Sequence, residues 1–417
     1  MKDTVNNKPE LMAPAGDWTM LRTAVNAGAD AVYFGVDKFN MRAKAKNFAL
    51  KDLPGIVEFC KENNVKTYLT INTIVFEEEI PELEELIIAA KNAGIDRVIC
   101  WDLSVAELCS QHDYPFCIST QGSVSNSLAA FVYKKLGAVR IVLARECSLE
   151  GIKKIRENTD LEIETFIHGA MCIAVSGRCF MSHHMFGQSA NRGECVQTCR
   201  REFEIYDSAS DKSLIMGEDY VMSPNDLCTI EFIDKLIEAG IDSFKIEGRK
   251  RSPEYVAKTV SVYRRAIDLY FSRGDGFPEG KLTDKNKKDL LKELKQVYNR
   301  GFSSGFYFDV PSSEDYANIH GSKATKKKEY LGKVLNYFQK AKTAHILIES
   351  GWLNKNDDLL IIGETTGVVE IKVTSFLRNN ESATSAEKGD EITFVVDDLV
   401  RPRDKVYLFK DVIKNIV

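Results

Sequence analysis

Five of the ten cysteines in this chain gather in one region, at positions 172, 179, 195, 199 and 228. The first two belong to the stretch HGAMCIAVSGRC, which follows an extended apolar run ending at His168 and Gly169. Thiols grouped in this way bind a metal or a cluster, form a catalytic site, or pack in a core. The other five cysteines stand in apolar surroundings, which is typical of small core residues.

The spacing of the grouped thiols favours an iron–sulfur cluster over zinc. Structural zinc sites use two tight C-x2-4-C pairs, whereas here the intervals are C-x6-C and C-x3-C with long gaps between and after them. A cluster takes four thiolates whose order along the chain is more variable. Zinc and buried or catalytic thiols remain alternatives.

Hydrolase signatures are weak in this sequence. The metalloprotease motif H-E-x-x-H is absent from the sequence. A nucleophile and base formed by Cys172 and His168 is an alternative, but it would leave the other thiols unexplained. His183 and His184, in MSHHMFGQ, are expected to be solvated or capping residues rather than ligands.

Eight short apolar runs alternate with segments of helical period that repeatedly end in a small residue and Gly. This alternation predicts parallel strands in an α/β fold, closed as a (β/α)8 barrel over residues 1–275. A doubly wound sheet is the alternative, but no run is followed by G-x-G-x-x-G. The cysteines fall in an insertion at about 169–222, and Cys228 is expected to open the next helix. The runs span residues 9–15, 30–36, 66–72, 96–102, 115–121, 139–145, 161–169 and 242–248.

The remainder of the chain changes character after the eighth unit. Residues 276–328 contain one amphipathic helix pattern followed by a polar linker. Residues 329–417 give six short alternating runs, which predict a small antiparallel β-barrel domain.

Composition excludes some classes of protein. With 44% hydrophobic and 28% charged residues, no uninterrupted apolar stretch near 18 residues and no secretory h-region, the chain is expected to be cytoplasmic and not membrane-spanning. Because the net charge is −5, any nucleic acid must bind to a local basic patch. The sequence does not decide whether the chain forms a homo-oligomer or pairs with a paralogous protein.

Polar residues stand at the ends of the predicted barrel strands. Active sites of such barrels lie at the C-terminal ends of the strands, so these positions are the candidates for chemistry. They are Asn40, Arg42, Asn72, Asp102, Gln121, Arg145, Glu146, Glu164, His168, Lys245, Glu247 and Arg249.

Several motifs, in order along the chain, resemble those of the collagenase-like peptidases of family U32. They are ELMAPAGD, AVYFG, FNMRAKAKNF, ETFIHGAMCIAVSGRCFMS, NRGECVQTCRREF, SPNDLC, KIEGRKRSPEYV, YNRGFSSGFY and DDLVRPRDKVYLF. The resemblance covers nearly the whole chain.

The resemblance implies RNA hydroxylation rather than proteolysis. It is strongest to the tRNA hydroxylation proteins, which form 5-hydroxyuridine at the tRNA wobble position with prephenate as co-substrate. It also implies a 4Fe-4S cluster held by Cys172, Cys179, Cys195 and Cys228, with the choice between Cys195 and Cys199 left open. Ribosomal RNA hydroxylation, collagenase-like proteolysis and RNA binding without catalysis are the alternatives.

Prephenate is a dicarboxylate, so its site needs cationic donors, for which guanidinium groups supply bidentate geometry. We expect substrate contacts from Arg42, Asn72, Gln121, Arg145 and Arg249. We expect catalytic groups among Glu164, His168, Lys245 and Glu247.

Basic clusters near the predicted barrel mouth suggest a phosphate track for tRNA. Its expected RNA contacts are Arg200, Arg201, Lys250 and Arg251, and the runs MRAKAK and KKK are further basic clusters. Phe39, Phe180 or Phe186 would stack on an unpaired base.

Overall fold

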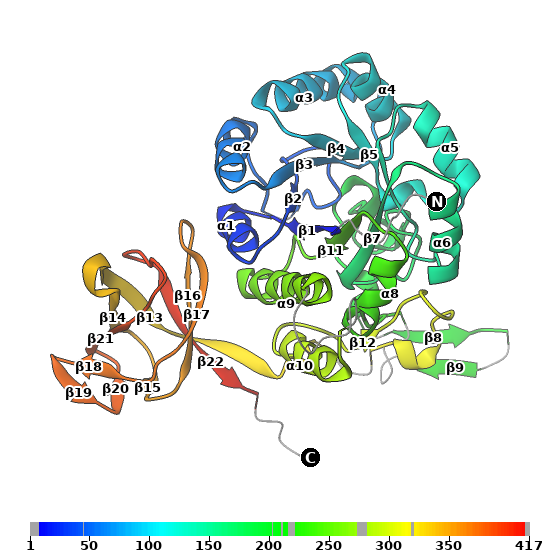
Figure 1. Ribbon diagram of the computed structural model, residues 1–417. Helices are drawn as coiled ribbons and strands as arrows, with labels where there is room; N and C mark the ends of the chain where they lie inside the picture. Colours follow the sequence, from blue (N-terminus) through cyan, green and yellow to red (C-terminus); the bar gives the residue numbers. More distant parts are fainter. Residues whose placement is uncertain are drawn as a thin grey trace.

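The computed structural model describes residues 8–44, 46–201, 203–209, 212–215, 222–272, 282–317 and 321–412. A barrel of parallel strands ringed by helices lies beside an antiparallel C-terminal sheet (Figure 1). Each part has its own hydrophobic core.

The barrel strands follow the eight apolar runs of the sequence. All eight pair in parallel, and the last strand pairs with both the first and the seventh, which closes the sheet. The predicted (β/α)8 fold is thus confirmed. The strands are β1 (Glu10–Pro14), β2 (Ala31–Phe34), β3 (Lys66–Ile71), β4 (Arg97–Cys100), β5 (Phe116–Ile118), β6 (Arg140–Val142), β7 (Glu162–Gly169) and β11 (Ser243–Ile246).

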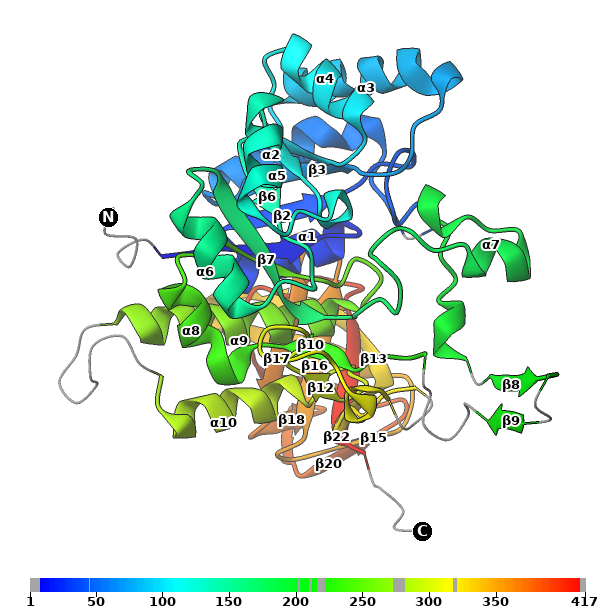
Figure 2. The ribbon, with the colours of Figure 1, turned by 90° about the vertical axis from the view of Figure 1, so that its right-hand side faces the viewer.

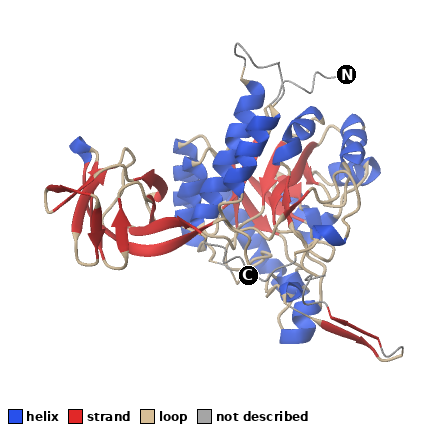
Figure 3. Ribbon diagram, turned by 90° about the horizontal axis from the view of Figure 1, so that it is seen from below, coloured by secondary structure: helices blue, strands red, loops and turns tan. Residues whose placement is uncertain are grey.

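Helices surround the barrel, as the view from below shows (Figure 3). Four of them begin at a side chain that accepts a hydrogen bond from a free backbone N–H group, namely Asp17, Asp102, Asn126 and Ser148. The helices are α1 (Trp18–Asn26), α2 (Leu53–Glu62), α3 (Ile80–Ala93), α4 (Leu103–Gln111), α5 (Ser127–Lys135), α6 (Leu149–Glu157), α8 (Ile233–Glu238) and α9 (Pro253–Phe271).

A buried charge network crosses the barrel interior. Arg140, on β6, lies 2.7 Å from Glu10 on β1 and 2.9 Å from Glu164 on β7. Apolar side chains such as Met12 and Cys117 pack in the same interior. Because a buried charge is costly unless it is paired, this network requires all of its members.

The connection between β7 and β11 carries α7 (Met181–Phe186), a hairpin of β8 (Glu204–Asp207) and β9 (Lys212–Ile215), and the short strand β10 (Asp226–Cys228). Figure 2 shows α7 and the hairpin projecting from one side of the barrel. We call the segment from 170 to 201 the cysteine insertion.

Specific contacts fix the cysteine insertion over the C-terminal ends of the strands. Arg192 pairs with Glu79, which precedes α3. Arg178 donates a hydrogen bond of 3.1 Å to the backbone oxygen of Gln121. Gly193 has a φ of +86° and packs so closely that a Cβ atom there would lie 2.2 Å from the Asn40 oxygen, so only glycine fits.

Cys228 ends strand β10 and does not open a helix, which corrects the prediction. β10 runs antiparallel to β7, with Cys228 opposite His168, and parallel to β12 (Phe302–Ser303). The following helix α8 begins only at Ile233, after a short 3-10 turn.

The C-terminal sheet is antiparallel, as predicted. Helix α10 (Asp284–Leu294) precedes it, and the predicted boundary at 275 lies outside the described residues. One sheet has the order β17-β16-β22-β13-β14-β21-β18-β19, and β15 pairs with β20. The strands are β13 (Lys326–Phe338), β14 (Thr343–Ile348), β15 (Trp352–Asn354), β16 (Asp358–Gly363), β17 (Gly367–Lys372), β18 (Phe376–Arg378), β19 (Glu381–Ala383), β20 (Ser385–Glu387), β21 (Glu391–Val395) and β22 (Lys405–Asp411).

Among the described helices, none combines the length and the apolar character needed to cross a bilayer.

Candidate active site

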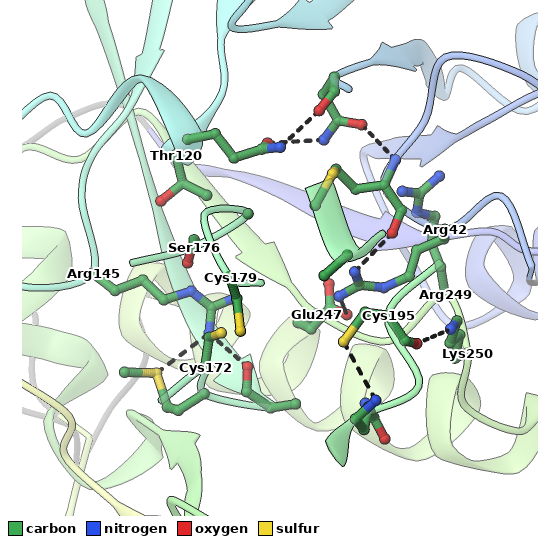
Figure 4. A pocket seen from close by; sticks show the side chains of 18 of the residues that line it. Arg42, Thr120, Arg145, Cys172, Ser176, Cys179, Cys195, Glu247, Arg249 and Lys250 are labelled. Atoms are coloured by element: carbon green, nitrogen blue, oxygen red, sulfur yellow. Dashed lines mark hydrogen bonds and ion pairs between the residues drawn. The ribbon is translucent and has the colours of Figure 1, made fainter. Parts of the chain in front are cut away.

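A single pocket at the C-terminal ends of the barrel strands collects most of the residues singled out from the sequence. The cysteine insertion forms its opposite wall, and Figure 4 shows side chains from both (Figure 4). We call it the barrel pocket. The predicted residues that line it are Arg42, Asn72, Gln121, Arg145, Cys172, Cys179, Cys195, Arg200, Lys245, Glu247, Arg249 and Lys250.

Lys245 forms part of the pocket floor, supported from below by Glu164. The Lys245 Nζ atom lies 2.8 Å from Glu164 Oε1 and 4.5 Å from the centre of the Tyr33 ring. Glu164 is fully buried and does not line the pocket. It therefore positions Lys245 rather than contacting a bound molecule.

Glu247 is the one carboxylate that lines the pocket among the described residues. Its Oε1 atom lies 2.9 Å from Arg42 Nη2, and Tyr33 donates a hydrogen bond of 3.2 Å to Oε2. Burial alone would raise the pKa of Glu247, but the charges of Arg42 and then Arg145 outweigh it and lower the pKa to about 2. Glu247 is consequently ionised at neutral pH and neutralises Arg42.

Arg145 and Arg249 line the pocket without a carboxylate partner in the described part of the chain. Arg249 donates to Asn40 Oδ1 (3.1 Å) and Thr70 Oγ1 (3.0 Å), and burial lowers its pKa to about 10. Arg145 donates to the Ala170 oxygen (2.6 Å), and its buried Nε atom has no hydrogen-bond partner. These two guanidinium groups, like that of Arg200, are not neutralised by a carboxylate within the described residues, which favours an anionic ligand.

Asn72 and Gln121 are tied to each other. Asn72 Nδ2 donates to Gln121 Oε1 at 3.0 Å, and Gln121 Nε2 donates to the Asn72 backbone oxygen at 2.7 Å. Both still line the pocket, where they form a polar patch held by fixed hydrogen bonds.

Four cysteines of the insertion line the barrel pocket, namely Cys172, Cys179, Cys195 and Cys199, and all four are free thiols. Cys172 and Cys179 lie near Arg145, whereas Cys195 lies on the side of Lys250 (Figure 4). Burial raises the pKa of Cys199, and the neighbouring Arg200 opposes this increase.

Cys228 lies outside the barrel pocket. It is buried between β7 and α9, with its Sγ atom 3.7 Å from the Tyr263 hydroxyl, and burial raises its pKa to about 12. The structure thus groups Cys199 with the other three thiols and leaves Cys228 in the hydrophobic core.

The four thiols of the barrel pocket are candidate ligands of a metal or a cluster. Within the residues that the structure describes, no three His, Cys, Asp or Glu side chains converge as ligands of one metal ion would. A 4Fe-4S cluster is larger than an ion and takes four thiolates from separate positions around it. The four pocket thiols supply the number and type of donor atoms that such a cluster takes.

His168 also lies outside the pocket. Its ring packs against Tyr255, Tyr263 and Phe302, with Nδ1 3.3 Å from the Tyr263 hydroxyl. Burial lowers its pKa to about 4, so the ring is neutral at pH 7. His168 does not line the pocket that Cys172 lines, and no histidine lines that pocket among the described residues.

The predicted RNA-binding residues differ in exposure. Arg201 and Lys250 are exposed, with the guanidinium of Arg201 4.5 Å from the Phe186 ring. Arg200 instead donates hydrogen bonds of 2.9 Å to Ser223 and Pro224, and Arg251 packs 3.9 Å from the Tyr298 ring.

Of the predicted aromatic residues, Phe180 and Phe186 are exposed, whereas Phe39 is buried and unavailable for stacking, which corrects that expectation. Tyr33 was not singled out from the sequence. It lines the pocket because it alternates with Ala31 toward the barrel interior, and that period of two in AVYFG is the signal that could have found it.

Residues 16–317 match the sequence signature of peptidase family U32. The chain belongs to this family. The U32 relatives include an uncharacterized protease of Methanocaldococcus jannaschii, 41% identical over 415 residues (97% of this chain, 99% of the relative). A collagenase of Porphyromonas gingivalis is 39% identical over 415 residues (97% and 98%). The tRNA hydroxylation protein P1 of Bacillus subtilis is 39% identical over 369 residues (87% and 85%).

Proposed function

We propose that this U32 protein is an RNA-hydroxylating enzyme that forms 5-hydroxyuridine at the wobble position of tRNA, with prephenate as co-substrate and a 4Fe-4S cluster as cofactor. The observation that carries the proposal is the barrel pocket, which combines uncompensated cations and four thiols with no lining histidine among the described residues. A relative 39% identical is named a tRNA hydroxylation protein, which supports the same reaction.

The cation excess supports a dicarboxylate co-substrate. Arg145 and Arg249 face the pocket without carboxylate partners among the described residues, while Glu247 and Glu164 already neutralise Arg42 and Lys245. Two guanidinium groups match the two carboxylates of prephenate in charge and in donor geometry. Arg145 and Arg249 are therefore its proposed anchors.

The four pocket thiols, Cys172, Cys179, Cys195 and Cys199, are the proposed cluster ligands. When bound, a cluster would supply one-electron redox chemistry or Lewis acidity beside the co-substrate. Arg42, Arg145 and Arg200 line the same pocket, so cationic groups surround the four thiols. Loops longer than about 12–15 residues with little regular structure are uncommon, and a cluster would crosslink this one.

The base would have to leave its stack to enter the barrel pocket. Enzymes that modify a base extrude it from a stack or act on a single strand, and unpaired bases stack on exposed aromatic side chains. Phe180 (63% exposed) and Phe186 (39% exposed) lie on the cysteine insertion, at the start and the end of α7, and suit this role. A wobble nucleotide stands in such an unpaired loop.

Proteolysis, which the names of two relatives suggest, lacks support in the pocket. Acyl transfer by a cysteine needs a base within hydrogen-bond reach. His168 is separated from Cys172 by its position outside the pocket, between β7 and α9.

The test uses anaerobically purified protein loaded with its cluster. With tRNA and prephenate, we expect 5-hydroxyuridine in digested tRNA, measured by mass spectrometry, and no product without prephenate. Arg249→Ala should lower product formation at least about tenfold while keeping its iron, because removing a charged hydrogen bond costs about 1.5–3 kcal/mol. Arg249→Lys serves as the charge-retaining control. Hydrolysis of collagen peptides without tRNA modification would contradict the proposal.

A further inference from the structure

A second cavity lies between the barrel and the C-terminal sheet. The sheet packs beside α1 and α9 (Figure 1), and ion pairs of 2.7 Å from Lys258 to Glu370 and 2.9 Å from Lys328 to Glu254 join the two parts. We call this cavity the interdomain cleft.

Cations dominate the lining of the interdomain cleft. The barrel contributes Lys44, Lys46, Arg249, Lys250 and Arg251, of which the three lysines are exposed. The C-terminal region adds the exposed residues Lys328, Arg403 and Lys405.

The cleft is lined by fewer carboxylates than cations, and two of its lysines pair with carboxylates outside the lining, Lys44 with Glu194 at 3.7 Å and Lys328 with Glu254 at 2.9 Å. The three carboxylates in the cleft lining are Asp17, Glu364 and Asp404. Asp17 caps α1 and lies 3.2 Å from Lys46, whereas Asp404 is buried and accepts hydrogen bonds from Thr366 and from the Arg401 backbone. Only Glu364 therefore remains as an exposed carboxylate without such a local role, and the cleft carries a net positive charge.

The turn that presents Arg403 is unusually constrained. Arg403 has a φ of +76°, a left-handed conformation that is uncommon for residues other than glycine. The turn is held by the hydrogen bond from Arg403 N to Val334 O (2.8 Å) and by the Asp404 carboxylate, which binds Arg401 N at 2.8 Å. These hydrogen bonds fix the backbone of Arg403 at the edge of the cleft.

The cleft adjoins the barrel pocket. Arg249 and Lys250 line both, and Lys250 Nζ donates a hydrogen bond of 3.1 Å to the backbone oxygen of Cys195. A polyanion lying in the cleft would therefore end at the mouth of the pocket.

We infer that the interdomain cleft binds the phosphate backbone of the RNA substrate, and that the C-terminal sheet serves to complete this phosphate site. The inference rests on the proposed function for the identity of the nucleotide in the pocket. Phosphates flanking that nucleotide would lie between Lys44 and Lys46 on the barrel side and Arg403 and Lys405 on the other. Such contacts position the substrate and do not perform the reaction.

The test replaces Arg403 and Lys405 together with alanine and compares a matched double variant, Lys355→Ala with Lys388→Ala. Lys355 and Lys388 are exposed on the same C-terminal region but do not line the cleft. Binding of tRNA is titrated against salt. Each lost phosphate contact lowers the log-log salt slope by roughly 0.7 to 0.9, so the cleft variant should lose about 1.4 to 1.8 and the control should not change.

Hydroxylation is then measured over a range of tRNA concentrations up to saturation, where the cleft variant should show a higher KM for tRNA and an unchanged kcat. An unchanged salt slope, an equal loss in the control variant, or no RNA binding by the unaltered protein would overturn the inference. If the unaltered protein binds tRNA through the cleft but forms no hydroxylated nucleoside, the result contradicts the proposed reaction and supports the inference about the cleft. If the unaltered protein hydroxylates tRNA but the cleft variant keeps the salt slope of tRNA binding, the result contradicts only the inference about the cleft.

Discussion

Cys199→Ala is expected to lose the iron–sulfur cluster, from about four irons per chain to near none. Cys199 lines the barrel pocket with the other three thiols, so its removal leaves one corner of the cluster without a thiolate. Cys228→Ala is expected to keep its iron, because that thiol packs in the core beside Tyr263. Iron and sulfide analysis of both variants after anaerobic purification measures the effect.

The two alanine variants also control for each other. Cys228 is a buried core position, so Cys228→Ala will show any loss of iron that follows from weakened folding alone. Iron retained by Cys199→Ala and lost by a well-folded Cys228→Ala would restore the ligand set expected from the sequence, with Cys172, Cys179, Cys195 and Cys228.

Glu164→Gln is expected to destabilise the fold by about 3–5 kcal/mol, because it removes one partner of a buried ion-pair network. Glu164 lies 2.9 Å from Arg140 and 2.8 Å from Lys245, and its side chain is about 1% exposed. Arg140 keeps Glu10, whereas Lys245 has no second carboxylate within the described residues. Denaturant unfolding at pH 7 measures the loss.

A double variant that also removes the unpaired charge of Lys245 serves as the control. Glu164→Gln combined with Lys245→Met should recover a large part of the stability, because replacing a buried pair by apolar groups is often neutral. A loss below about 1 kcal/mol in the single variant would show that the network is not what holds β6, β7 and β11 together at this point.

The sequence predicted the barrel well because its signals are periodic. Each apolar run became a strand, and strand-end residues such as Arg42, Arg145 and Arg249 meet because parallel strands present their C-terminal ends on one side. The antiparallel C-terminal sheet likewise follows alternating runs.

The direction of the His168 side chain could not be predicted in this way because the pairing of β7 is locally irregular. Glu164 and Phe166 point into the barrel, so a period of two predicts that His168 does too. The pairing of β7 with β11 shifts between Lys245 and Ile246, which sets His168 opposite Ile246 and turns its ring outward. Such a bulge moves every later side chain to the other face and leaves no mark in the composition.

The cysteine insertion was the hardest part to predict. Its apolar and polar residues do not alternate with a helical or strand period, so the sequence does not show which side chains point inward. Neither the internal hydrogen bonds of Arg200 nor the grouping of Cys199 with Cys172 could therefore be predicted. The DLC stretch that ends at Cys228 is a three-residue strand, too short for a pattern to distinguish from a helix start.

The most direct test of the central claim is nucleoside analysis of tRNA from cells with and without this gene. We predict that 5-hydroxyuridine disappears with the gene, returns with the unaltered protein, and does not return with Arg249→Ala or Cys199→Ala. Unchanged tRNA nucleosides, or the loss of a hydroxylated nucleoside from ribosomal RNA alone, would contradict the assignment of tRNA as the substrate.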